Sequence, residues 1–257
     1  MSSFAISSIV FGVVFGGAMV GMFLRAVLPQ HSLNDDTKDL VKMGMGLVAT
    51  MSALVLGLLV SSAKNSYDAL NGEWTRVAAK VILLDRTLAL YGPEAKEVRD
   101  QLRAGVEGMI ERMEMKKSAK PSQVSASNRE IDEVYKKIQG LSPNDDKQRS
   151  IQGRALDILG SIQEIKWVIF EHEATSISMP MLIILVSWLV TLFISFGLFA
   201  PANRTAFTAL LVSALSVSGA VFLILELYAP YGGIIRVLST PFRVALAQMG
   251  NWLFDLN

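Results

Sequence analysis

The chain has 257 residues, of which 51% are hydrophobic and only 18% are charged, and its formal net charge is +1. Soluble domains are typically about 45–50% apolar and about 25% charged, so this composition argues against a water-soluble globule. The near-neutral balance excludes a global field that would attract nucleic acid, and the absence of cysteine excludes disulfides, thiolate nucleophiles and cysteine-bound metals.

Four long segments are almost free of charge, and each is long enough to cross about 30 Å of hydrocarbon as a helix. Glu226, near the end of the fourth, is their only formal charge. The predicted spans cover residues 4–24, 43–63, 177–200 and 206–229. A cleaved secretory signal is the alternative for the first span, but no basic residue precedes it. The backbone of a span must satisfy its own hydrogen bonds, which makes all four helical.

A charged insert separates the second span from the third. Of the 47 formal charges (24 Lys and Arg plus 23 Asp and Glu), 36 fall between Lys64 and Glu173. Lys and Arg near the span ends favour a cytoplasmic location for the insert and for both termini. The predicted domains are a transmembrane hairpin, the helical insert, a second hairpin and an amphipathic tail, at residues 1–63, 64–176, 177–229 and 230–257.

The second span is predicted to continue past the membrane as a helical stem. Apolar residues follow it in alternating steps of three and four, a heptad pattern that requires partner helices along its length. They are Tyr67, Leu70, Trp74, Val77, Val81, Leu84, Leu88 and Tyr91. Gly92 ends the stem, and Pro93 opens the next helix at a position where proline is tolerated.

The rest of the insert is predicted to be helical, apart from one loop. Residues 118–127 are rich in serine and lack periodicity, so we expect a loop there, followed by a short helix that Asn128 caps and Gly140 ends. A long helix then leads to the third span, and its apolar face makes it the expected partner of the stem. In the tail, Pro241 is predicted to separate two short amphipathic helices, which lie at the headgroup level or against the insert.

No group of residues suited to catalysis stands out. Ionisable side chains inside a span are costly and usually serve a task, yet the spans contain no paired aspartates, proton relay or metal-spaced histidines. His172 stands between two glutamates, which fits a solvated helix surface better than a metal site. We therefore expect no enzyme, no catalytic or metal site and no cofactor.

Small and weakly polar residues occupy one face of the second span. They recur in steps of three and four at Gly46, Thr50, Ala53, Gly57, Ser61 and Lys64. One interpretation is a pore wall in which a partly apolar ring gates by dewetting. Its narrow part would be formed by Thr50, Leu54, Gly57, Leu58 and Ser61. The other is close helix packing through small residues. In an oligomer, Lys64 would form a positive ring at the pore mouth, which favours anions.

Two charged residues and two glycine pairs in the spans also require an explanation. Glu226 is expected to form an ion pair with Arg236 or Arg243, or else to serve as a cation site or gate. Arg25 is expected to reach the lipid phosphates, with an anion-attracting vestibule as the alternative. Close packing is predicted for the pairs Gly12 with Gly16 and Gly17 with Gly21.

Four segments form a recognisable set. They are the run from Gly21 to Arg25 with Leu28, Pro29 and His31, GMGLVATMSALVLGLLVSSAK at 44–64, LLDRTLALYGPEA at 83–95, and YGGIIRVLSTPF at 231–242. Together they resemble the bacterial bestrophin-like family of membrane proteins, distant relatives of the bestrophin anion channels. The resemblance implies four spans, a cytosolic helical insert and a pentamer in the bacterial inner membrane whose pore is lined by the second helix. It departs at the bestrophin neck, where bulky aromatic residues are replaced by Thr50, Leu54, Gly57 and Leu58.

The predicted protein is an all-α, four-span integral membrane protein that is oligomeric around an axis. Its expected function is passive conduction of small, chloride-like anions. A cation-selective channel and a non-conducting helical scaffold or sensor are the alternatives. The expected partners are membrane lipid, inorganic ions and further copies of the chain, but no nucleic acid.

Overall fold

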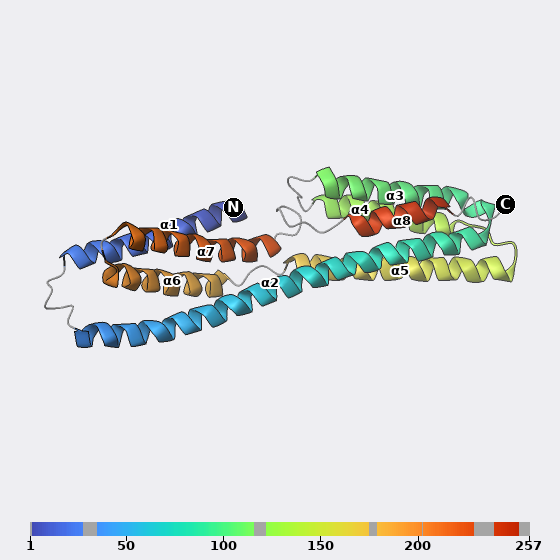
Figure 1. The fold of residues 1–257 in the computed structure, drawn as a ribbon. Coiled ribbons are helices and arrows are strands. Elements are labelled where there is room, and N and C mark those ends of the chain that lie inside the picture. The colour runs from blue at the N-terminus through green and yellow to red at the C-terminus, as the bar shows by residue number, and fades with distance from the viewer. Residues whose placement is uncertain are drawn as a thin grey trace. The chain divides into compact units, whose positions relative to one another are not determined.

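The computed structural model describes residues 2–27, 35–115, 122–174, 179–201, 203–228 and 239–251 (Figure 1). Nearly all of these residues are helical and none of them lies in a strand, so the predicted all-α class is confirmed. In chain order the elements are α1 (Ser3–Val27), α2 (Asp35–Tyr91), the short 3₁₀ turn η2 (Pro93–Ala95), α3 (Lys96–Met115), α4 (Ser122–Gln139), α5 (Asp146–Ala174), α6 (Met179–Phe199), α7 (Arg204–Leu227) and α8 (Thr240–Asn251).

The chain divides into two compact units. The first, here called the apolar unit, comprises Met1–Tyr67 and Ser176–Ala229. The second, the charged unit, comprises Asp68–Thr175 and Pro230–Asn257. The single helix α2 contributes its first part to the apolar unit and its second part to the charged unit.

Four helices are long and apolar enough to cross a membrane, and each overlaps one predicted span; the second extends well beyond its span, into the stem. They are Ser3–Val27, Lys38–Tyr91, Met179–Phe199 and Arg204–Leu227. The start of α7 is fixed by a side-chain cap, because Asn203 Oδ1 accepts a hydrogen bond of 2.8 Å from the backbone N–H of Ala206.

Within the apolar unit, α1 packs against α6 and α7 (Figure 1). Gly21 allows the closest approach, since a Cβ at this position would overlap the carbonyl oxygen of Ile194 on α6. Gly17 faces Val190 and Ile194 in the same contact, so close packing of the pair Gly17 and Gly21 is confirmed. Packing of the other pair is not observed, because a Cβ on Gly12 or Gly16 has no heavy atom within 4 Å.

Within the charged unit, the heptad stripe of α2 is buried as predicted. Leu84 and Leu88 are 0% exposed, and Leu70, Trp74, Val77, Val81 and Tyr91 are also buried. The predicted partner α5 runs alongside and anchors the end of the stem, because Gln148 Nε2 donates a hydrogen bond of 3.0 Å to the carbonyl of Tyr91 (Figure 1). Helix α8 also contributes, through an edge-on contact between Trp74 and Phe242 with ring centroids 5.9 Å apart.

The end of the stem also agrees with the prediction. Helix α2 stops at Tyr91, and Gly92 adopts a φ of 126°, a left-handed value that side chains rarely adopt. Pro93 then opens η2. The first N–H groups of a helix have no partner within it, so a proline, which lacks this N–H, costs no hydrogen bond here.

The start of α4 differs from the prediction. The helix begins at Ser122 rather than at Asn128, so part of the predicted loop is helical and Asn128 lies inside the helix. Alanine is the best helix former, glutamine is close to it and serine is only moderately poorer, so these residues can continue a helix that is packed elsewhere. Val134 and Ile138 are buried and hold α4 in place, and the helix ends at Gln139, directly before Gly140.

The described part of the tail forms one helix, α8. Pro241 lies in its first turn, where proline is tolerated. The helix predicted before Pro241 falls largely outside the described residues. Phe242 and Ala245 are fully buried in the charged unit, so α8 packs against the insert, the second of the two predicted locations.

Candidate functional site

The apolar stretch of α2 is the least covered of the four candidate spans. Only 11% of its most hydrophobic window is buried within the chain, against 33%, 39% and 33% for α1, α6 and α7. Leu47 is 66% exposed, Leu54 74% and Leu58 56%. Exposing so much apolar surface to water is unfavourable, whereas lipid or another protein chain can cover it favourably.

All the residues predicted to line a pore lie on this uncovered side of α2. They are Gly46, Thr50, Ala53, Leu54, Gly57, Leu58, Ser61 and, at the mouth, Lys64, and every one is exposed in the single chain. The covered side carries Ser52, Leu59 and Ala63. Each of these three follows a pore-face residue by two positions, which is about 200° around a helix. The small residues therefore face away from the helices of their own unit.

The glycines on this face are not packing sites within the chain. A Cβ built on Gly46 or Gly57 meets no heavy atom within 4 Å, in contrast to Gly21. The close-packing interpretation of the stripe therefore requires contacts from outside the described chain. Thr50 Oγ1 donates a hydrogen bond of 2.9 Å to the carbonyl of Gly46, so its hydroxyl oxygen and methyl group form the outward surface at this level.

One end of this stretch is tied to the bundle. The hydroxyl oxygens of Ser62 and Tyr228 lie 3.1 Å apart, which links α2 to the end of α7. Lys64 follows on the exposed side, with its Nζ 5.8 Å from the ring centroid of Tyr67. A cation over the face of an aromatic ring is attracted by the ring's electrons, which restricts its position.

Arg25 caps a helix within the apolar unit. Its Nη1 donates to the carbonyl of Phe199 at 3.4 Å and also to that of Ala200, both at the C-terminal end of α6. A guanidinium in this position compensates the partial negative charge of the helix end. Arg25 remains exposed, so the two predicted roles, binding of lipid phosphates and an anion vestibule, stay predictions.

Glu226 is only 3% exposed and lies inside the apolar unit. Arg243, one of its two predicted partners, belongs to the charged unit and donates from Nε to Glu114 at 2.9 Å. The other predicted partner, Arg236, lies outside the described residues. The burial of Glu226 does not favour a cation site exposed to water.

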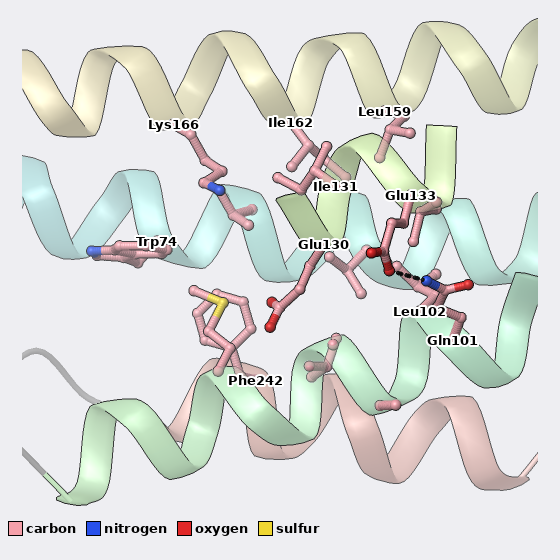
Figure 2. A pocket seen from close by; sticks show the side chains of 17 residues that line it. Trp74, Gln101, Leu102, Glu130, Ile131, Glu133, Leu159, Ile162, Lys166 and Phe242 are labelled. Carbon is pink, nitrogen blue, oxygen red and sulfur yellow. Dashed lines mark hydrogen bonds between the residues drawn. The ribbon is translucent and has the colours of Figure 1, made fainter. Parts of the chain in front are cut away.

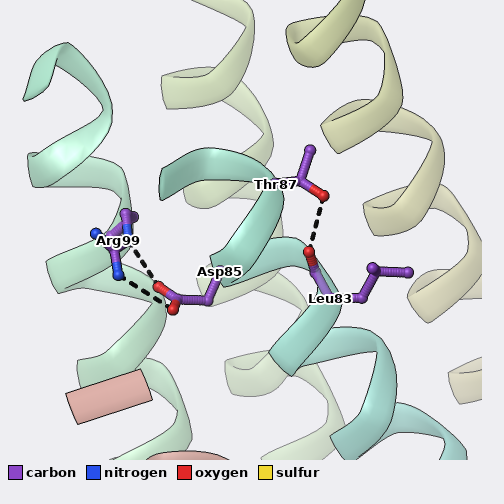
Figure 3. Close-up of polar contacts among 4 residues, drawn as sticks. All are labelled: Leu83, Asp85, Thr87 and Arg99. Atoms are coloured by element: carbon purple, nitrogen blue, oxygen red, sulfur yellow. Dashed lines mark hydrogen bonds and ion pairs between the residues drawn. The ribbon is translucent and has the colours of Figure 1, made fainter. Parts of the chain in front are cut away.

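The charged unit carries a buried ion pair between α2 and α3 (Figure 3). Arg99 donates from Nε and Nη2 to the two carboxylate oxygens of Asp85, at 2.8 and 3.2 Å. Asp85 is 3% exposed. Nearby, Thr87 Oγ1 donates to the carbonyl of Leu83 at 2.8 Å, so this buried hydroxyl is satisfied within its own helix.

A cavity in the charged unit contains a residue that the sequence patterns did not reveal. Lys166 on α5 lines it together with Trp74, Glu130 and Phe242 from three other helices (Figure 2). The position of Lys166 on the buried face of α5 could have been predicted from the sequence, because it lies four residues after Ile162 and three before Ile169, and both are buried. Burial lowers the pKa of Lys166 to about 8, an effect that Arg112 adds to and that Glu130 and Asp132 oppose.

The described residues contain no group of three His, Asp or Glu side chains close enough to hold a metal ion. The side chains of His31 and His172 are not among those described.

Residues 12–242 match the bestrophin-like domain family. The chain belongs to the bestrophin-like family. The resemblance of its four apolar segments and stem to this family is therefore confirmed. It is a membrane protein of a family of ion channels rather than enzymes.

Solved structures support the same fold. A variant of a bacterial bestrophin homologue from Klebsiella pneumoniae is 14% identical, with a TM-score of 0.68 over 97% of this chain and 97% of that one. A second variant of the homologue is 13% identical, with a TM-score of 0.62 over 92% of this chain and 97% of that one. No match was found among curated protein sequences.

Proposed function

We propose that this bestrophin-like protein is an oligomeric anion channel whose pore is lined by the small-residue face of α2. Thr50, Leu54, Gly57, Leu58 and Ser61 form its narrow part, and Lys64 forms a positive ring at one mouth. Conduction is passive, since the proposal requires neither a cofactor nor a metal. The permeant ions are small anions such as chloride.

The observation that carries the proposal is the uncovered state of this face. The other three apolar helices pack on one another, while the α2 stretch turns its glycines and hydroxyls away from its own unit. A ring of several chains gives that face an aqueous axis and covers the adjacent leucines with neighbouring subunits. A pentamer is the subunit number suggested by the family resemblance.

The arrangement in the membrane is part of the same proposal. The spans at 4–24, 43–63, 177–200 and 206–229 lie in the bacterial inner membrane, in contact with lipid. The insert at 64–176, the tail at 230–257 and the N-terminus lie in the cytoplasm, as the distribution of Lys and Arg favours.

The two alternatives receive less support. A cation channel based on Glu226 requires that carboxylate to meet water, and it is buried. A scaffold that binds other proteins through its heptad stripe requires the stripe to be accessible, and Leu84 and Leu88 are fully buried by their own chain. The uncovered surface of α2 lies instead in its apolar stretch.

Ion flux in liposomes tests the proposal. The purified full chain, reconstituted into chloride-loaded liposomes, is expected to discharge the chloride gradient. In planar bilayers with a salt gradient, Lys64→Glu is expected to shift the reversal potential toward cation preference, because the ring of charge at the mouth changes sign. Lys136→Glu, an exposed lysine on α4 outside the pore face, is the matched control and should leave the reversal potential unchanged.

Two results would contradict the proposal. In the first, liposomes with confirmed protein insertion retain their gradient as protein-free liposomes do, which leaves a non-conducting scaffold. In the second, the wild-type reversal potential already indicates cation preference and is unaffected by Lys64→Glu.

A further inference from the structure

A cavity of about 290 Å³ lies between the helices of the charged unit. Side chains from α2, α3, α4, α5 and α8 line it, and most of them are apolar (Figure 2). Val77, Val106 and Ile162 belong to its walls and are buried. Sites for small molecules are typically about 300–1,000 Å³ with apolar walls and a few polar groups, so this cavity lies at the small end of that range.

The carboxylates at the cavity are already engaged by the chain itself. Arg112 donates to both oxygens of Glu130, at 2.8 and 2.7 Å. Gln101 Nε2 donates to Glu133 at 2.9 Å (Figure 2). An amine ligand would have to compete with these contacts, so the acidic residues do not make this a cation site.

Lys166 is the only lysine or arginine among the described residues that line the cavity. Its side chain reaches from α5 into the space between the helices, near Trp74 and Glu130 (Figure 2). It is only partly accessible to solvent, and most of the surrounding wall is apolar. A partly desolvated ammonium beside an apolar wall matches a ligand that has an anionic head and a short apolar body.

We propose that this cavity binds small amphipathic carboxylates, with the ligand carboxylate on the Lys166 ammonium and its apolar body between Val77, Val106 and Ile162. The ligand needs a negative charge at one end and a chain of a few carbons. The site is separate from the pore face and does not depend on whether the protein conducts ions.

Calorimetric titration of the purified full chain in detergent with hexanoate tests this proposal. Hexanoate is small enough for the cavity and partitions weakly into micelles, whose contribution is subtracted in a protein-free titration. Two matched ligands separate the parts of the interaction. Acetate keeps the charge without the chain, and hexan-1-ol keeps the chain without the charge. Saturable binding of hexanoate, with both controls roughly tenfold weaker or more, is expected.

Two variants identify the site. Lys166→Met removes the charge at similar length and is expected to weaken hexanoate binding at least about tenfold. Gly105→Leu adds a side chain at a cavity-lining position where a Cβ meets no heavy atom within 4 Å, and is expected to abolish binding by filling the space. Lys136→Met and Gly153→Leu make the same changes at exposed helical positions outside the cavity and should bind like the wild type.

The protonation state gives an independent readout. Hexanoate remains ionised above pH 7, whereas Lys166 loses its proton as the pH rises above about 8. Binding should therefore weaken between pH 7 and pH 10 in the wild type and show no such pH dependence in Lys166→Met.

Three results would overturn the proposal. The first is the absence of saturable hexanoate binding to the wild type. The second is equal binding to the wild type, Lys166→Met and Gly105→Leu. The third is loss of binding in Lys64→Met with retention in Lys166→Met, which would assign the anion to the pore mouth instead of the cavity.

Discussion

Helix α2 is continuous from Asp35 to Tyr91, yet its two parts are covered very differently. In the part that belongs to the apolar unit, Leu54 is 74% exposed and Leu58 is 56% exposed. In the part that belongs to the charged unit, Leu84 and Leu88 are fully buried. The two parts have the same secondary structure, so the difference lies entirely in what packs on them.

The comparison shows which interactions the single chain completes by itself. The stem is covered by helices of its own chain, which bury its heptad stripe from several sides. In the apolar stretch, Ser52, Leu59 and Ala63 are buried and the opposite side is uncovered. In water this uncovered surface would be unfavourable, but in lipid or in an oligomer it is not. The stem is thus completed by helices of its own chain, whereas the apolar stretch leaves open the surface that the proposed channel assigns to lipid, ions and other copies.

The largest expected effect comes from shortening a leucine in each part. Leu88→Ala leaves a cavity in the fully buried stripe and is expected to lower the free energy of unfolding by about 2–5 kcal/mol. Leu54→Ala removes the same atoms from an exposed position and is expected to change it by less than about 0.5 kcal/mol within the protomer. Thermal unfolding of both variants in detergent, followed by circular dichroism, measures the difference.

The oligomer supplies the control for this experiment. If neighbouring chains cover Leu54, its truncation lowers the stability of the assembly, which size-exclusion chromatography with light scattering detects separately. Equal destabilisation of the dissociated protomer by both variants would contradict the comparison, since it would mean that the apolar stretch is packed within its own chain.

The features that depend on local sequence were predictable. The four apolar helices follow from hydropathy, and the buried face of the stem follows from its heptad spacing. The end of α2 follows from Gly92, whose left-handed φ other residues rarely adopt. The start of α4 was predicted wrongly, because the serines and the missing apolar periodicity suggested a loop, whereas the helix is held further along by the packing of Val134 and Ile138.

The candidate sites depend less on local sequence. The small-residue face of α2 was visible as a pattern, but the pattern could not distinguish a packing face from an open one. Gly21 and Gly57 have similar neighbours in sequence, and only the structure shows that the first touches another helix. The cavity at Lys166 was not predictable, because five helices distant in sequence form it.

The two glycines provide the second prediction. In Gly21→Ala the new Cβ would overlap the backbone of α6, so α1 and α6 must separate, at an expected cost of about 1–3 kcal/mol. Gly57→Ala adds a methyl group in open space and is expected to stabilise the helix slightly, by up to about 1 kcal/mol. The midpoint of thermal unfolding in detergent should therefore fall for the first variant and remain or rise for the second.

The opposite result for Gly57 would be informative. A loss of stability in Gly57→Ala that appears only at protein concentrations where the assembly forms would show that a neighbouring chain packs closely on this face. That outcome would support helix packing over a water-lined pore and would argue against the proposed conduction pathway.

The smallest expected effect is a pH dependence that arises only in the charged unit. The pKa of Lys166 is lowered to about 8 in the fold, from an ordinary value of 10.5. Below pH 8 this lysine is charged in both the folded and the unfolded state, and folding bears the full cost of its desolvation. Between about pH 8 and 10.5 the unfolded state binds more protons, so the free energy of unfolding rises with pH in this window.

Replacement of the lysine isolates this contribution. Lys166→Met is expected to unfold about 2–4 °C above the wild type at pH 7, and the difference should shrink as the pH rises from 8 to 10. Burial raises the pKa of Tyr91, and this tyrosine contributes equally to both proteins, so subtraction removes it. Lys136→Met, at an exposed position, should show no such trend. If the difference in unfolding temperature between Lys166→Met and the wild type stays constant from pH 7 to 10, the lysine is not desolvated in solution. The contrast between a stem covered by its own chain and an uncovered apolar stretch then rests on the leucines and glycines alone.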